Sequence, residues 1–356
     1  MTIHDLDTPC LLVDRAAMER NLARMAEFCR ARRAKLRPHF KSHKCTRIAR
    51  LQLEAGNCCG ITCALVSEAE VLVGAGVRDI LIANQVLGRG KLQRLAQLNR
   101  QADVKCCVDS PVQVEALAAA ARAAGVEIGV LVEINVGLNR AGVDTAEQAV
   151  QLARLVDRTP GLRFRGLQAY EGHACFVEDA PRRRQIVEEA LAKVRAVRSA
   201  CAAAGIAIPA VSAGGTGTYE ETGSAQDVDE LQVGSYALMD ARYRRVRPEF
   251  DHALFLWSTV LAVQADRAVF DVGYKSCGAE SGPPHISGWA EQPREFKLNE
   301  EHFCVSGVRG RFVVGQKVRL IPWHGCTTAN LYREIHLVEG DNVIETWPVE
   351  AAGCRL

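Results

Sequence analysis

The 356-residue sequence lacks a strong excess of charge of either sign. Its 44 lysine and arginine residues nearly balance 42 aspartate and glutamate residues, which leaves a net charge of +2. No basic block stands without acidic neighbours, so we expect binding neither to nucleic acid nor to an anionic membrane. The shares of hydrophobic (48%) and charged (24%) residues are those of an ordinary globular chain that can bury a large core.

The sequence also lacks long apolar runs and C-x-x-C pairs. No stretch of roughly eighteen apolar residues occurs, and the acidic N-terminal segment has no apolar core like that of a signal peptide, so we expect a cytoplasmic protein. Fourteen cysteines without a C-x-x-C pair exclude a zinc ribbon. With vicinal pairs at Cys58-Cys59 and Cys106-Cys107, we interpret them as reduced thiols in the core.

Short apolar segments alternate with helical patterns from about residue 35 to residue 240. The predicted strands are 35–38, 61–64, 79–83, 104–108, 130–136, 164–169, 210–213 and 230–233. Between them apolar residues recur at helical spacing, as in 112–124, 146–156 and 182–204. Such units predict a (β/α)8 TIM barrel over residues 14–248, an α/β fold, with an open doubly wound sheet as the alternative.

The pattern changes in the last hundred or so residues. Short β-type runs follow one another without long helical segments, at 256–265, 268–272, 301–305, 311–314, 317–321 and 334–338. They predict a second, mainly antiparallel β-domain made of residues 1–13 and 249–356. The strand-like segment 9–13 either pairs with this domain or leads into the barrel.

Lys41 is the first candidate for a reactive group. It follows the first predicted strand, between two histidines, in the run LRPHFKSHK. A lysine at such a place is ordinarily a solvated cation. Here the nearby Arg37 and Lys44, together with the histidines, would disfavour a protonated amine, and an imine-forming lysine needs to lose that proton.

Two glycine turns follow the seventh and eighth predicted strands. Active sites of TIM barrels lie at the carboxyl ends of the strands, and phosphate is commonly bound after the last two. The turn 214–217 and the turn at Gly234 and Ser235 offer backbone N–H groups and hydroxyls that suit a phosphate. Either one alone is more often a plain tight turn. Together with Lys41, expected about one barrel diameter away, they fit pyridoxal phosphate.

Several motifs in their order and spacing resemble the D-threonine aldolase group. That group belongs with the D-serine dehydratases in the alanine-racemase-like fold type of pyridoxal-phosphate enzymes. The motifs are LRPHFKSHK, GLNRAGV, GLQAYEGH, SAGGTGTYEE, ELQVGSYALMD, DVGYKS followed by AESGPP, and PWHGCTTANLY. The resemblance extends from Asp7 to about Trp347, and it implies a homodimer that acts on a small D-amino acid.

The resemblance also implies roles for individual residues. Lys41 would form the imine with the cofactor, and Arg140 would contact its phenolate oxygen. Gln232 would lie near its pyridine nitrogen, where a neutral amide leaves that nitrogen unprotonated and weakens the electron sink. The other cofactor-binding residues would be His39, Gln168, Tyr170, Gly214, Gly215, Thr216, Gly234, Ser235 and Tyr236.

His324 and Cys326 are the metal candidates. Alternate residues of one strand face the same side, so an imidazole and a thiolate two residues apart can reach one ion, although most isolated H-x-C sequences are not ligand pairs. In the family that the chain resembles, the corresponding motif binds a divalent cation near the substrate's β-hydroxyl. The aldolases tend to carry aspartate where Cys326 stands, and a thiolate favours zinc over manganese or magnesium.

A second departure from the aldolases concerns the base for the substrate's hydroxyl. Many of them have a histidine a few residues after the tyrosine that corresponds to Tyr170, and Phe176 stands there in this chain. His173 is therefore the candidate base, with Glu171 as a nearby substitute.

Two lyase activities use these groups. The first is an aldolase acting on a D-β-hydroxy-α-amino acid such as D-threonine, D-phenylserine or D-3-hydroxyaspartate. His173 or a metal-bound hydroxide takes the hydroxyl proton, the Cα–Cβ bond breaks, and glycine and an aldehyde leave. In the second, a zinc-dependent dehydratase, Lys41 removes the α-proton and the products are a 2-oxo acid and ammonia. A racemase, which needs a second base, and a non-catalytic cofactor carrier, which lacks a second domain, rank below both.

Overall fold

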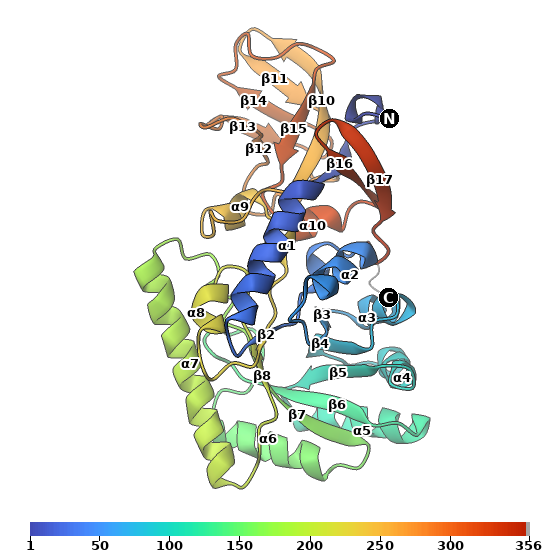
Figure 1. Ribbon diagram of the computed structural model, residues 1–356, viewed down its shortest axis with the longest axis vertical. Coiled ribbons are helices and arrows are strands. Elements are labelled where there is room, and N and C mark those ends of the chain that lie inside the picture. Colours follow the sequence, from blue (N-terminus) through green and yellow to red (C-terminus); the bar gives the residue numbers. More distant parts are fainter. Residues whose placement is uncertain (354–356) are drawn as a thin grey trace. The chain divides into compact units, whose positions relative to one another are not determined.

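The computed structural model describes residues 1–353, which fall into two compact units (Figure 1). Residues 1–24, 42–48 and 235–353 form the β-unit, and residues 25–41 and 49–234 form the barrel unit. The domain boundaries at residues 14 and 248 stay a prediction, because compactness does not test where a separately folding domain begins and ends.

Eight parallel strands form the sheet of the barrel unit. They are β2 (Lys35–Leu36), β3 (Ile61–Cys63), β4 (Asp79–Gln85), β5 (Asp103–Val108), β6 (Ile128–Glu133), β7 (Leu162–Ala169), β8 (Val211–Ala213) and β9 (Glu230–Leu231). Pairing runs in chain order from β3 to β9 and then to β2. Isolated parallel bridges, Leu36 to Cys58 and His39 to Thr62, connect β2 back to the β3 side. The ring is thereby closed, and the predicted (β/α)8 barrel is confirmed.

Helices connect the barrel strands, and local sequence signals account for where several of them begin. They are α1 (Arg15–Arg30), α2 (Thr46–Ala55), α3 (Val66–Gly74), α4 (Arg89–Leu98), α5 (Pro111–Ala124), α6 (Ala146–Arg158), α7 (Ala180–Ala203) and α8 (Tyr219–Gly223). Ser110 and Thr145 begin α5 and α6 with capping boxes, and the Asp179 carboxylate caps α7. No helix within residues 1–353 has both the length and the apolar character needed to cross a membrane.

Charged side chains meet at the amino ends of barrel strands. Arg37 is buried and pairs with Glu230 at 2.7 Å and with Asp79, which are the first residues of β9 and β4. Lys105 also reaches Asp79, at 2.9 Å. Two carboxylates therefore balance the charge of Arg37 at this end of the barrel, which corrects the expectation that Arg37 repels the amine of Lys41.

The β-unit contains a nine-stranded sheet. Strands β1 and β16 pair in parallel, and all other neighbouring strands of this sheet pair antiparallel. The strands are β1 (Cys10–Asp14), β10 (Leu254–Gln264), β11 (Arg267–Phe270), β12 (His285–Ile286), β13 (Phe296–Leu298), β14 (Phe303–Ser306), β15 (Lys317–Ile321), β16 (Glu334–Glu339) and β17 (Asn342–Pro348). Short helices are η1 (Ile3–Asp5), η3 (Ser235–Ala237), α9 (Ala241–Arg244) and α10 (Gly325–Ala329). The predicted second, mainly antiparallel sheet is confirmed, and the N-terminal strand β1 pairs with other strands of this sheet.

Two expectations for the β-unit differ from the structure. Residues 311–314 were expected as a strand, but they form turns between β14 and β15, and the side chains of Val313 and Val314 are exposed. Their apolar character therefore does not reflect pairing. The strand β17 was missed because half of its residues are polar, yet its backbone pairs with β16 along the whole hairpin.

The cysteines of the described chain are free thiols, and each is buried or half-buried. Cys106 and Cys107 lie side by side on β5, in the barrel sheet. Burial raises the pKa of Cys106 to about 12, so this thiol stays protonated and behaves as a small apolar core residue.

Gly166 provides a test of the barrel packing. It lies at a bulge in the pairing of β6 with β7, its φ is 126°, and a Cβ there would collide with the backbone of Ala210. We expect Gly166→Ala to lower the free energy of unfolding by about 3 kcal/mol or more, measured by denaturant titration. The matched control is Gly90→Ala in α4, where a Cβ meets open space. Equal losses of stability in the two variants would contradict this account.

Candidate active site

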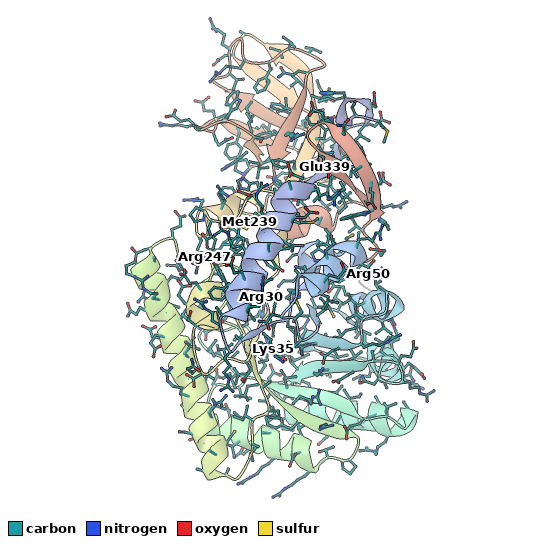
Figure 2. The ribbon with its side chains drawn as sticks, in the orientation of Figure 1. Arg30, Lys35, Arg50, Met239, Arg247 and Glu339 are labelled. Atoms are coloured by element: carbon teal, nitrogen blue, oxygen red, sulfur yellow. The ribbon has the colours of Figure 1, made fainter. Side chains whose placement is uncertain are left out.

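The strand order of the barrel unit brings Lys41 next to the glycine turns. Lys41 lies in the short helix η2 (Phe40–Ser42), just past the carboxyl end of β2. Figure 2 labels Lys35, the first residue of that strand. The N–H of His39 donates to the carbonyl of Val233 at 3.0 Å, so the chain around Lys41 runs beside the segment that enters the Gly234 turn.

The second glycine turn follows on the next strand. The N–H of Gln232 donates to the carbonyl of Ala213 at 2.9 Å, which aligns the end of β9 with the start of the turn 214–217. Adjacent strands are about 4.8 Å apart. The ends of β2, β9 and β8 are therefore neighbours, which corrects the expected separation of one barrel diameter between Lys41 and the turn.

A buried carboxylate shapes the turn 214–217. Glu171 is 2% exposed, and its Oε2 accepts a hydrogen bond from the N–H of Gly214 at 3.1 Å. Its Oε1 accepts from the hydroxyls of Thr218, at 2.6 Å, and Thr222. Because both oxygens are engaged away from solvent, Glu171 acts as a support for the turn and is not a substitute base for the substrate.

Close packing leaves room only for glycine at three of the four positions of this turn. Gly214 has a φ of 83°, in the left-handed region. A Cβ on Gly215 would lie 2.7 Å from the sulfur of Cys175, and one on Gly217 would collide with the carbonyl of Cys175. Thr216 is the one residue of this turn with a side chain, so the turn presents mostly bare backbone, and this geometry fits a cradle for a phosphate group.

Arg140, Tyr170 and His173 meet where the loops after β6 and β7 come together. The Arg140 guanidinium lies 5.6 Å from the centre of the Tyr170 ring and 3.7 Å from Glu133. The His173 ring packs against Gly137, where a Cβ would lie 2.9 Å from its Nε2. The fold therefore brings together three of the predicted residues from two separate loops.

The surroundings of His173 suit a proton acceptor. Burial lowers the pKa of His173 below its ordinary value of 6.5, so the imidazole is neutral at neutral pH. Its Nδ1 is buried and has no hydrogen-bond partner within residues 1–353. A neutral imidazole with an unpaired ring nitrogen has the properties that the predicted base requires.

Gln168 and Gln232 form a buried amide pair. The Nε2 of Gln232 donates to the Oε1 of Gln168 at 2.5 Å and to the hydroxyl of Ser212 at 2.7 Å. Both amides are held by β7 and β8, at the strand ends that also carry the glycine turn. These hydrogen bonds hold the uncharged amide of Gln232 in place.

The remaining predicted residues lie in the β-unit. Ser235 and Tyr236 belong to η3, and the buried Tyr236 ring packs edge-on against Phe250 with centres 6.0 Å apart. The hydroxyl of Ser235 lies 3.5 Å from the sulfur of Cys326, and that sulfur is 3.6 Å from the hydroxyl of Ser42. Two hydroxyl groups thus flank the predicted metal-binding thiol.

His324 and Cys326 do not share a strand, so that part of the prediction is wrong. His324 is the N-cap of α10 and Cys326 is the second residue of the helix. Burial alone would lower the pKa of His324, but its hydrogen bond to Cys326, the charge of Cys326 and the carboxylate of Glu280 raise it to about 9. The helix start therefore brings imidazole and sulfur together, as a zinc-binding pair requires.

Glu280 is a functional candidate that was not identified from the sequence. Its carboxylate accepts hydrogen bonds from Nδ1 of His324 and, at 3.2 Å, from the hydroxyl of Thr327. The sequence feature that could have identified it is the carboxylate inside the AESGPP motif.

The supporting role of Glu171 also had a feature in the sequence. Thr218 and Thr222 are four residues apart, which places both hydroxyls on one side of a helical turn.

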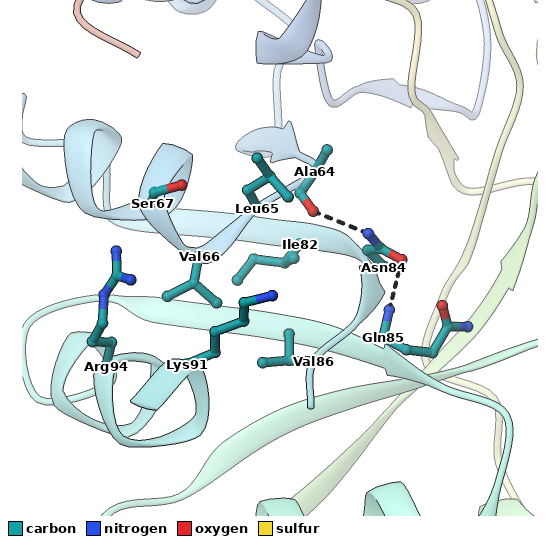
Figure 3. A pocket seen from close by; sticks show the side chains of 10 residues that line it. All are labelled: Ala64, Leu65, Val66, Ser67, Ile82, Asn84, Gln85, Val86, Lys91 and Arg94. Atoms are coloured by element: carbon teal, nitrogen blue, oxygen red, sulfur yellow. Dashed lines mark hydrogen bonds between the residues drawn. The ribbon is translucent and has the colours of Figure 1, made fainter. Parts of the chain in front are cut away.

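A small hollow opens at the carboxyl ends of β3 and β4, beside the start of α3 (Figure 3). It has a volume of about 60 Å³ and is lined by Ala64, Leu65, Val66, Ser67, Ile82, Asn84, Gln85, Val86, Lys91 and Arg94. Ligand sites for cofactor-sized molecules usually measure roughly 300 Å³ or more. The hollow has room for a few water molecules only, and none of the predicted site residues lines it.

Comparison with family models covers most of the chain. The model described as "Alanine racemase, N-terminal domain" matches residues 13–241. The model described as "Putative serine dehydratase domain" matches residues 253–338. The two matches fall one after the other, in the order in which the barrel strands and most of the β-unit strands occur along the chain.

Known proteins resemble the chain over nearly its whole length. The 3-hydroxy-D-aspartate aldolase of Paracoccus denitrificans is 36% identical, with 98% of this chain and 93% of the relative covered. The D-threonine aldolase of an Arthrobacter species is 37% identical with the same coverage. Both comparisons run through the lysine motif, the glycine turns and the PWHGCTTANLY segment.

Solved structures give the same picture. The D-threonine aldolase from Filomicrobium marinum has a TM-score of 0.96 at 38% identity, with 100% of this chain and 98% of that chain covered. A D-threo-3-hydroxyaspartate dehydratase variant from Delftia, solved in a metal-free form, has a TM-score of 0.85 at 28% identity, with 98% of both chains covered. The chain is therefore more similar in sequence to these aldolases than to this dehydratase.

The role of Glu171 can be tested by hydrogen exchange. Glu171→Ala removes the acceptor of one backbone N–H and two hydroxyls, so we expect faster amide exchange in residues 214–218 and a loss of about 2–3 kcal/mol in the free energy of unfolding. The control is Glu220→Ala, an exposed glutamate in α8. Exchange in the turn that is equally slow in both variants would show that Glu171 does not support it.

Proposed function

The chain belongs to the alanine racemase-like family that includes the D-threonine and 3-hydroxy-D-aspartate aldolases, and from this membership we propose that it cleaves D-β-hydroxy-α-amino acids to glycine and an aldehyde. The chain is a lyase in this reading, and the aldolases are its more similar relatives. The structural observation that carries the proposal is the adjacency of β2, β9 and β8, which gathers Lys41 and two glycine turns at neighbouring strand ends.

The barrel unit contains most of the residues proposed for pyridoxal phosphate. Lys41 would hold the cofactor's aldehyde, Arg140 its phenolate oxygen, and the turn 214–217 its phosphate. When bound, the cofactor supplies an electron sink for negative charge at the substrate's Cα. His39, Gln168, Tyr170, Gly214, Gly215, Thr216, Gln232, Gly234, Ser235 and Tyr236 complete the proposed set.

His173 and Lys41 move the protons in this proposal. His173 accepts the proton of the substrate's β-hydroxyl while the Cα–Cβ bond breaks, and the hydroxyl carbon leaves as an aldehyde. Lys41 then returns a proton to Cα, so the remaining part of the substrate becomes glycine. The neutral state and unpaired Nδ1 of His173 support its role.

His324 and Cys326 would hold a divalent metal. Imidazole and thiolate favour zinc, with manganese or magnesium as alternatives, and the bound metal would supply Lewis acidity for the loss of the hydroxyl proton. No group of three or more His, Cys, Asp or Glu side chains in residues 1–353 is arranged to hold a metal. The pair would thus leave coordination positions to water or to the substrate.

We include a homodimer and a cytoplasmic location in the proposal. The motif resemblance supports the homodimer, and the many reduced thiols support a reducing compartment. The partner molecule is a small D-amino acid, in keeping with a chain whose charges nearly balance.

One observation favours a second candidate function. Cys326 places a sulfur beside His324, and the thiolate form of this motif is typical of the zinc-dependent dehydratases. In a D-serine or D-3-hydroxyaspartate dehydratase, Lys41 would remove the α-proton and the metal would assist the departure of hydroxide. The products would then be a 2-oxo acid and ammonia.

Product analysis separates the two functions. The purified protein, supplied with pyridoxal phosphate and zinc or manganese, is incubated with D-threonine, D-phenylserine, D-serine and D-3-hydroxyaspartate. We expect glycine and the matching aldehyde, measured by amino-acid analysis and aldehyde trapping. Formation of 2-oxo acid and ammonia without glycine would refute the aldolase proposal in favour of the dehydratase.

The assignment of Lys41 has a spectroscopic test. Replacing it with alanine removes the amine that holds the cofactor, so we expect Lys41→Ala to lose the visible absorbance of lysine-bound pyridoxal phosphate. Lys91→Ala, at an exposed lysine beside the hollow in Figure 3, should keep it. An unchanged spectrum in Lys41→Ala would show that the cofactor is bound elsewhere.

A further inference from the structure

A short loop of the β-unit is fastened to the segment that carries the proposed metal pair. The N–H of Gly278 donates to the hydroxyl of Thr328 at 3.0 Å, and the indole N–H of Trp323 donates to the hydroxyl of Ser281 at 3.1 Å. These bonds lie on either side of Glu280 in the chain. The loop is therefore held at both ends against residues 323–328.

Close packing also joins this loop to the segment 323–328. A Cβ on Gly278 would collide with the side chain of Thr327, and one on Gly282 would collide with the ring of Trp323. Both glycines are thus required for the close approach of the two segments. The backbone on either side of Glu280 is consequently fixed, although its carboxylate is 47% exposed.

The Glu280 carboxylate faces the imidazole of His324. Its Oε1 accepts a hydrogen bond from Nδ1 of His324. The hydroxyl of Thr327 lies 3.3 Å from Oε1 and 3.2 Å from Oε2 of Glu280 and donates to the carboxylate. No lysine or arginine within residues 1–353 forms an ion pair with it. The contacts of Glu280 therefore point to the histidine rather than to the balancing of a surface charge.

A carboxylate on Nδ1 determines which nitrogen of His324 is available. With Nδ1 carrying the proton that Glu280 accepts, the lone pair of the neutral ring is on Nε2. Nε2 is then the ring nitrogen left to face a metal. The ring is thus oriented in the way in which a metal-binding histidine must be.

We propose that Glu280 is the positioning residue of the metal site, which holds His324 through Nδ1 so that Nε2 is presented to the metal together with the sulfur of Cys326. The proposal rests on the proposed function for the pair His324 and Cys326. Glu280 itself does not bind the metal. Thr327 is the second donor that keeps the carboxylate in place.

The test is metal affinity, measured without turnover. The metal-stripped full-length protein, with its pyridoxal phosphate in place, is titrated with Co²⁺, and the thiolate-to-cobalt absorbance reports binding. We expect Glu280→Ala to weaken Co²⁺ binding by about 10–100-fold. Glu280→Gln keeps an oxygen that accepts from Nδ1, so its affinity should lie between those of Glu280→Ala and the unmodified protein.

Two controls make the titration specific. Glu300→Ala removes an exposed glutamate of the same unit, paired with Lys275 at 2.8 Å, and should leave Co²⁺ affinity unchanged. At saturating Co²⁺, Glu280→Ala should still show the thiolate absorbance, because Cys326 remains a ligand. A general loss of structure would instead remove that absorbance and lower the melting temperature of the protein.

The outcomes separate this proposal from the proposed function. If Glu280→Ala binds Co²⁺ as tightly as the unmodified protein while His324→Ala loses it, Glu280 is not a positioning residue and the metal pair stands. If Glu280→Gln is as weak as Glu280→Ala, the hydrogen bond to Nδ1 is not the cause and the proposal is overturned. If His324→Ala keeps full affinity, both the proposal and the metal pair are overturned.

Discussion

The backbone hydrogen bonds that join β2 to β9 and β9 to β8 are the constraint on which the barrel site depends. They place the chain around Lys41 beside the Gly234 turn, and that turn beside 214–217. Because parallel strands all end at the same edge, an amine and two glycine turns that are far apart in sequence become neighbours. The proposed aldehyde-binding lysine and the proposed phosphate-binding turn are thus close enough to contact one small molecule.

A negatively charged side chain behind the proposed phosphate-binding turn needs an explanation, since it would repel a phosphate. Glu171 compensates for this repulsion by holding the turn in place, because the Gly214 N–H and the hydroxyls of Thr218 and Thr222 all donate hydrogen bonds to it. The turn is held in one conformation before a ligand arrives, so little conformational entropy remains to be lost on binding. Pre-organisation outweighs repulsion here if the ligand's charge is met mainly by backbone N–H groups and Lys41.

Much of the fold could be predicted from local sequence, and the failures have a common cause. Barrel strands such as β3, β5, β6 and β8 are mostly apolar segments with buried residues along their length, so their own residues identify them. In the β-unit, Val313 and Val314 are apolar but exposed, whereas the polar strand β17 is held by its pairing with β16. Strand pairing depends on residues elsewhere in the chain, so local composition does not predict it.

The candidate site also combines residues that local sequence identifies with residues whose role depends on distant parts of the chain. Lys41 and the glycine turns could be predicted because each belongs to a compact motif at a strand end. Glu280 could not, because its role depends on a contact with His324, forty-four positions along the chain. The wrong strand assignment of His324 and Cys326 had no effect on the pairing itself, since the first turn of a helix after an N-cap histidine also brings i and i+2 into contact.

The choice between the two lyase reactions depends on which base acts first. If His173 takes the hydroxyl proton, the Cα–Cβ bond is the one that weakens; if Lys41 takes the α-proton, the hydroxyl becomes the leaving group. Burial keeps His173 neutral and ready to accept a proton. Gln232 offers no positive charge to strengthen the electron sink, and because both reactions place negative charge at Cα, this feature bears on them equally. The neutral His173 favours breaking the carbon–carbon bond, in agreement with the greater similarity of the chain to the aldolases.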